Sequence, residues 1–143
     1  TVKILVNGTN HPDKIVSSGS ISLDRAATTA SVGLKYRALV RTLDPEVQTE
    51  EGPSQGKTRR VERVTARLVD TYNLKIGDTL SNLQEVLFRT SDIAMGEIEL
   101  YTGDKRLLLN HTPNRQFDLY FVHDDPLPCT ILAVFYALVV SDR

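Results

Sequence analysis

Short stretches in which apolar and polar residues alternate recur roughly every ten residues along this chain, with turn-forming residues between them. Ser20 to Asp24, Glu97 to Thr102 and Phe117 to His123 are three of these stretches. Alternation with this period places one face of a strand on a core and the other face in water. The sequence therefore predicts an all-β fold, an antiparallel β-sandwich or barrel-like domain with little helix.

Glycine-containing turns separate several of the expected strands. Asn7-Gly8 follows the apolar run Val2 to Val6, and Asn-Gly is a favoured type I′ hairpin turn. Gly103-Asp104 lies between Glu97–Thr102 and Arg106–Asn110, which predicts a second tight hairpin.

Length and charge limit what the chain can be. Its 143 residues are enough for one domain with one core, so we expect residues 1 to 143 to form a single β-rich domain. The formal net charge of −1 means that any contact with nucleic acid needs a local basic patch. Because the first residue is Thr1 rather than Met, we expect the chain to be a piece of a longer protein.

Two long segments are expected to hold strands. Residues 30 to 43 contain two strand-like runs of different parity, so a bend or bulge is expected between them. The longest apolar run, Cys129 to Val140, is too short to cross a bilayer, so no membrane segment is expected. We interpret Ile131 to Val140 as the final, buried strand.

The most basic part of the chain is a candidate functional segment. Its cations are Lys57, Arg59, Arg60, Arg63 and Arg67. From residue 62 onward apolar and polar residues alternate, and the apolar members are Val64, Ala66 and Leu68. This pattern predicts a strand with Arg63 and Arg67 on the face opposite the core. A helix is the alternative, because Val61, Val64 and Leu68 also fit a period of 3.6 residues.

The basic segment follows the longest loop expected from the sequence, Glu46 to Lys57. The loop contains Gly52, Pro53 and Gly56, and its acids are Glu46, Glu50 and Glu51. Loops near a dozen residues inside a compact domain are usually functional or disordered. We expect Glu46 to Gly56 to be mobile in an isolated domain and to be ordered by a partner subunit.

No catalytic residue, metal ligand set or cofactor site is predicted. The three histidines are scattered, and the Asp124-Asp125 pair after His123 is interpreted as a turn rather than a metal site. No Gly-x-Ser-x-Gly motif is present, and Gly-Lys-Thr at residues 56 to 58 lacks the first glycine of a phosphate-binding loop, where Glu51 stands. Cys129 is the only cysteine, so no intrachain disulfide is possible, and we interpret it as a core residue.

Three interpretations of the basic strand remain open. It is a solvated face balanced by nearby acids, a subunit interface in which arginine pairs with carboxylates, or a surface along which DNA passes through phosphate contacts. Aromatic residues are not interleaved with the arginines, which argues against stacking on single strands.

Several segments, taken in order, resemble tail tube protein B, or tail nozzle (stabilisation) proteins, of short-tailed bacteriophages and related prophages. The resemblance covers nearly the whole chain and rests on residues 2–13, 31–36, 41–45, 55–61, 67–71 and 124–133. The family often has Pro where Lys35 stands and Leu where Cys129 stands. Neither departure removes a catalytic group, because the family is not enzymatic.

The resemblance implies a C-terminal domain fragment of a virion tail protein, assembled in the host bacterial cytoplasm. It implies a homo-oligomeric ring, a hexamer in size, that double-stranded DNA passes through and that contacts other tail or adaptor proteins. Candidate interface or DNA-passage residues are then Lys57, Arg59, Arg60, Arg63 and Arg67, with Glu46, Glu50 and Glu51 as a candidate interface loop.

An alternative is an adhesin-like β-sandwich that recognises host glycans. The absence of Trp and the presence of only five Tyr weaken that alternative. An enzyme domain is the third and last hypothesis.

Overall fold

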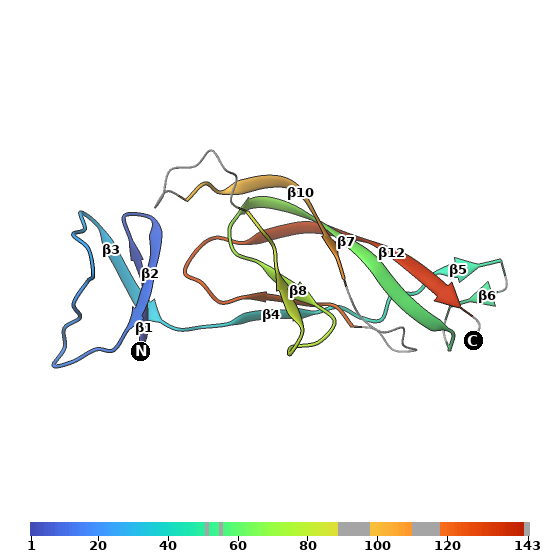
Figure 1. Ribbon diagram of the computed structural model, residues 1–143, viewed down its shortest axis with the longest axis horizontal. Helices are drawn as coiled ribbons and strands as arrows, with labels where there is room; N and C mark the ends of the chain where they lie inside the picture. Colours follow the sequence, from blue (N-terminus) through green and yellow to red (C-terminus); the bar gives the residue numbers. More distant parts are fainter. Residues whose placement is uncertain (51, 55, 89–97, 110–117, 142–143) are drawn as a thin grey trace.

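The computed structural model describes residues 1–50, 52–54, 56–88, 98–109 and 118–141 (Figure 1). All regular secondary structure in these ranges is β-strand, and all strand pairs are antiparallel. This confirms the predicted all-β fold, and the described strands do not close into a barrel. No helix in the described part of the chain is long and apolar enough to cross a membrane.

The strands of these described ranges form four sheets. Their bounds are β1 (Val2–Val6), β2 (Thr9–Lys14), β3 (Ala30–Leu34), β4 (Ala38–Arg41), β5 (Gln48–Thr49), β6 (Gly52–Pro53), β7 (Thr58–Thr71), β8 (Lys75–Gly77), β9 (Leu83–Glu85), β10 (Tyr101–Leu108), β11 (Tyr120–His123) and β12 (Thr130–Ser141). The sheet orders are β2-β1-β3, β10-β7-β12, β4-β11-β8-β9 and β5-β6. The first sheet lies at one end of the molecule, and β5 and β6 lie at the other (Figure 1).

The hairpin of β1 and β2 turns as its sequence predicts. Asn7 and Gly8 have φ angles of 50° and 76°, and a type I′ turn requires positive φ at both central residues. The alternating residues Val2, Ile4 and Val6 are buried and form a small core of their own. Ile21 and Leu23, from the segment that follows β2, pack against this core.

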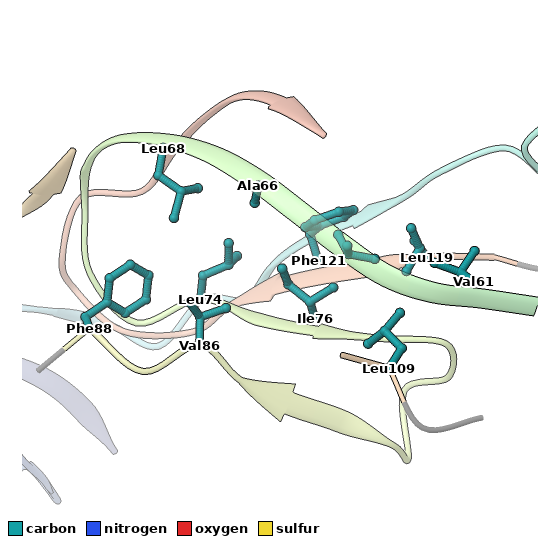
Figure 2. Packing of buried hydrophobic residues seen from close by; sticks show 11 residues of the cluster. Val61, Ala66, Leu68, Leu74, Ile76, Val86, Phe88, Leu109, Leu119 and Phe121 are labelled. Atoms are coloured by element: carbon teal, nitrogen blue, oxygen red, sulfur yellow. The ribbon is translucent and has the colours of Figure 1, made fainter. Parts of the chain in front are cut away.

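The larger core lies between the sheet β10-β7-β12 and the sheet β4-β11-β8-β9, as in a β-sandwich. The long strand β7 contributes Val61, Val64, Ala66 and Leu68, all fully buried. Figure 2 shows Ala66 and Leu68 pointing toward the residues that the other sheet and its flanking segments supply. Those residues include Leu74, Ile76, Val86, Leu119 and Phe121. The strand prediction for β7 is confirmed, and its helical alternative is wrong.

The hairpin predicted at Gly103-Asp104 is wrong, because Tyr101 to Leu108 form one continuous strand beside β7. Gly103 has a φ of 143° and lies where the register of this pair shifts. A Cβ at Gly103 would lie 2.9 Å from the hydroxyl oxygen of Tyr101, so the Tyr101 side chain would have to shift to make room for it. The glycine therefore marks a β-bulge within a strand rather than a turn.

The bend predicted within residues 30 to 43 is confirmed. Residues 35 to 37 separate β3, which pairs with β1, from β4, which pairs with β11. The chain thus passes from the small core to the large one at this point. An ion pair between Lys3 Nζ and Asp125 Oδ1, at 3.2 Å, also joins the two parts, and the prediction of a single domain remains open.

We expect the larger core to depend strongly on Leu68. Leu68→Ala removes a fully buried side chain, so the free energy of unfolding should fall by about 2–5 kcal/mol. Leu108→Ala is the matched control, because Leu108 lies in the same sheet but is 68% exposed, and it should change stability by less than about 0.5 kcal/mol. Urea denaturation measures both, and equal losses would contradict the assignment of the core.

Candidate functional site

The outer face of β7 carries the arginines that the sequence placed there. Arg63 and Arg67 are exposed, while Val64, Ala66 and Leu68 are buried, as predicted. Ala137 of β12 pairs with Arg63 and Leu138 pairs with Val61, so Glu62 is an extra residue in β7. This bulge turns Arg60 to the same face as Arg63, although an odd spacing in a regular strand would separate them.

Arg67 is held by residues on both neighbouring strands. Its guanidinium donates two hydrogen bonds to the carboxylate of Asp104 on β10, at 2.8 and 3.0 Å. The same guanidinium lies 5.5 Å from the centre of the Phe135 ring on β12. The hydrogen bond from Arg67 lowers the pKa of Asp104 below its usual value. Arg67 is therefore positioned across the whole width of the sheet.

Two neighbouring strands add residues that the sequence analysis missed. Arg106 of β10 is exposed opposite Thr65, and Phe135 and Val139 of β12 are half exposed on the same face. We call this surface the arginine face, made of Arg60, Arg63, Arg67, Arg106, Phe135 and Val139. The alternation of residues 102 to 108 indicates that Arg106 is exposed. The interpretation of Gly103-Asp104 as a hairpin turn prevented this from being recognised in the sequence.

The prediction that the last strand is buried is wrong. β12 is an edge strand, so only β7 pairs with it among the described strands. Leu132, Phe135, Tyr136 and Val139 are each at least 41% exposed. The absence of charged residues indicated burial. Because β12 lies at the edge of its sheet, however, many of its side chains are exposed to solvent.

Arg59 departs from the expectation that the basic residues serve assembly. It is only 2% exposed, because it lies on the core face of β7. Its guanidinium donates a hydrogen bond to the Pro45 carbonyl oxygen at 2.7 Å and pairs with the carboxylate of Asp44. Arg59 therefore links the segment after β4 to β7, and it stabilises the fold. Lys57 is half-buried and lies immediately before the same strand.

The acidic loop carries internal hydrogen bonds. The Glu46 carboxylate accepts hydrogen bonds from the Ser54 backbone N–H at 2.9 Å and the Ser54 hydroxyl at 3.3 Å. Ser54 Oγ in turn accepts one from the Val47 N–H at 3.1 Å, and β5 pairs with β6. Glu50 is exposed, and Glu51 lies outside the described residues. The loop has local structure in a single chain, and its expected mobility stays a prediction.

His11 and the paired aspartates Asp124 and Asp125 form hydrogen bonds or ion pairs with other residues of the fold. His11 is buried and its Nε2 accepts a hydrogen bond from the Asp24 N–H at 3.0 Å. Asp124 pairs with Lys75 at 3.1 Å, and Asp125 pairs with Lys3. No group of three potential ligands that could hold a metal ion occurs among the described residues. His111 lies outside them.

A scan against protein-family models finds no match for this chain, and a search of curated proteins finds none either. The arginine face is therefore interpreted from its own chemistry. Exposed guanidinium groups bind carboxylates and phosphates, and half-exposed aromatic and aliphatic side chains beside them are typical of protein interfaces.

We expect Arg59 and Arg63 to differ sharply in their effect on stability. Arg59→Ala removes a buried guanidinium together with its hydrogen bond to the Pro45 carbonyl and its ion pair with Asp44, so the free energy of unfolding should fall by about 2–4 kcal/mol. Arg63→Ala, the control on the exposed face, should change it by less than about 0.5 kcal/mol. Thermal and urea denaturation measure both. A neutral Arg59→Ala would show that this residue has no role in the fold.

The ion pair of Arg67 and Asp104 should appear in the pH dependence of stability. Because the pKa of Asp104 is lowered on folding, the pair stabilises the fold above about pH 4 and loses this effect as the pH falls through the folded-state pKa. The stability difference between the native chain and Asp104→Asn should therefore shrink as the pH falls from about 5 to about 2. Arg67→Gln should abolish most of that change. A difference independent of pH would contradict the pairing in solution.

Proposed function

We propose that this chain is a non-enzymatic structural part of a bacteriophage tail. In this proposal it assembles with copies of itself into a ring of the tail tube or nozzle, through which double-stranded DNA passes and is retained. The family resemblance of the ordered sequence segments supports the proposal. The hexameric ring, the virion location and contacts with other tail or adaptor proteins belong to the same proposal.

The observation that carries the proposal is the arginine face. Arg60, Arg63 and Arg106 form no ion pair with any residue that the structure describes. They are presented by the ordered central strands of a sheet rather than by a loop, so their spacing is fixed. Cations in a fixed array repel one another until an anionic surface is brought to them. Phosphates of DNA and carboxylates of a neighbouring subunit both meet this requirement.

The glycan-binding alternative has weaker support in the residues. Sugar rings commonly pack on exposed aromatic side chains, and this chain has no Trp. Of the two exposed aromatic residues on β12, Phe135 is already in contact with Arg67. Glycan binding by the chain, with no self-association, is the result that would favour this alternative.

The test is the mass in solution of Arg60→Ser/Arg63→Ser, measured by light scattering on the chain and on any longer protein that contains it. Both residues are exposed, so melting should hardly change. Self-association should weaken, and should weaken further as salt rises and screens the remaining charge pairs. If it is DNA that binds to the face, the salt slope of DNA binding should fall by about one for each phosphate that the variant no longer neutralises.

Lys14→Ser/Arg25→Ser is the control for net charge, because it removes the same two charges from β2 and the segment after it. Lys14 pairs with Asp24 and Arg25 donates a hydrogen bond to Thr9, so the melting of this control is measured as well. This control should leave assembly and DNA binding unchanged. A chain that stays monomeric alone and within the longer protein would contradict the proposed ring. Equal effects of the two double variants would show that the arginines contribute only through the net charge of the chain and not through their position on the arginine face.

A further inference from the structure

Free sheet edges differ in how well they are protected against pairing with another chain. Charged residues, proline and short length are the usual protections of an edge strand. Among the described strands, β2 contains Pro12, β10 contains three consecutive charged residues, and β9 has three residues. β4 has four residues and includes Arg41. β5 and β6 have two residues each, and the remaining edge strands, β3 and β12, contain neither charge nor proline.

β12 presents the longer of the two unprotected edges. Its twelve residues, Thr130 to Ser141, are mostly β-branched, aliphatic or aromatic. β7 occupies one side of this strand, and no described strand occupies the other. The backbone N–H and C=O groups along the open side can therefore accept one more strand.

An apolar groove lies beside the start of β12. Its volume is about 430 Å³, and its lining includes Tyr36 and Val40 from the β4 side, Cys129 and Ile131 from the β12 side, and Phe121 and His123 between them. Nε2 of His123 is buried and has no hydrogen-bond partner among the described residues. The groove thus offers mainly apolar contacts, which is typical of a site that takes an apolar occupant.

β3 has the pattern that such an edge and groove require. Val32 and Leu34 are 50% and 83% exposed, and with Ala30 they lie on one face of the strand. They stand opposite Ile4, Val2 and Val6 of β1, so this is the apolar face of the small sheet. Ser31 and Gly33 lie on the other face. An added strand needs this alternation, with apolar residues toward the sandwich and small polar ones toward solvent.

We propose that β3 of one copy of this chain pairs with the free edge of β12 in the next copy, with Ala30, Val32 and Leu34 directed into the groove. The proposal rests on the proposed assembly and specifies how neighbours join. The pairing is heterologous, because it uses two different edges, so repetition closes a ring or extends a filament.

The native Cys129 makes this contact testable. It lines the groove, and it is the only cysteine in the chain. Val32→Cys and Leu34→Cys each place a thiol on the apolar face of β3, whereas Ser31→Cys places one on the opposite face. Mild oxidation at alkaline pH followed by non-reducing electrophoresis measures covalent multimers. Alkaline pH is needed because burial raises the pKa of the Cys129 thiol.

We expect Val32→Cys or Leu34→Cys to give roughly fivefold or more covalent multimer than Ser31→Cys, because a disulfide forms only where two Cα atoms lie within about 7 Å. Adding Cys129→Ser should abolish these multimers. Light scattering on the same samples separates this inference from the proposed function. A chain that is monomeric both alone and within a longer protein would overturn both. An oligomer in which neither variant gives more covalent multimer than Ser31→Cys would overturn the strand pairing alone. Covalent dimers of Ala137→Cys/Cys129→Ser would do the same, because they would indicate that β12 pairs symmetrically with β12 of another copy.

Discussion

The backbone ladder of β7 is the constraint on which the rest of the larger unit depends. β7 is the middle strand of its sheet, so β10 and β12 take both their register and their facing from it. The bulge at Glu62 lies in the pair with β12, and the bulge at Asp70 lies in the pair with β10. The extra residue Glu62 brings Arg60 onto the arginine face, and Asp70, with a φ of 43°, lies at the bulge opposite Thr102. A small number of local irregularities thus decides which side chains the outer face of the sheet exposes.

Charged groups on the two faces of this sheet do different work. On the inner face, Arg59 is buried against Asp44 and Pro45, and Lys105 lies opposite Ala66 with its ammonium 4.4 Å from the centre of the Tyr101 ring. These two cations lie at the edges of the core. On the outer face only Arg67 has an ionic partner among the described residues of the sheet. The division follows burial, because a buried charge without a partner is costly and an exposed one is not.

Sequence reasoning identified what local chemistry determines. The φ preference of Asn7-Gly8 fixes the first hairpin, and the alternation of residues 64 to 68 fixes the facing of β7. It failed where distant parts of the chain decide. Gly103 looks the same in a bulge as in a turn, and only the pairing of Tyr101–Leu108 with β7 distinguishes them. An apolar strand at a sheet edge likewise has the composition of a central strand, so the exposure of β12 was not predictable from its residues.

Arg59 shows the same limit within the candidate site. Its neighbours in sequence are basic, which suggested a common role, but its neighbours in space are Asp44 and Pro45. Alternation places Arg59 and Arg60 on opposite faces of β7. Counting back from residues 63 to 68 would nevertheless assign each of them to the wrong face, because the extra residue Glu62 shifts the alternation. A register error of one residue exchanges core and surface for every side chain beyond it.

The outer arginines and the uncharged edge of β12 belong to one sheet, but salt acts on them differently. Main-chain hydrogen bonds and apolar contacts at an edge are hardly screened, whereas ion pairs of exposed guanidinium groups weaken as the Debye length falls to about 3 Å at 1 M salt. If neighbours join through both surfaces, salt should remove the contribution of Arg60 and Arg63 while strand pairing persists. The arginines would then set the orientation and rate of the encounter between copies, and the β12 edge would set its lifetime. Contacts of these two kinds on adjacent parts of one sheet would make such an assembly both selective and durable.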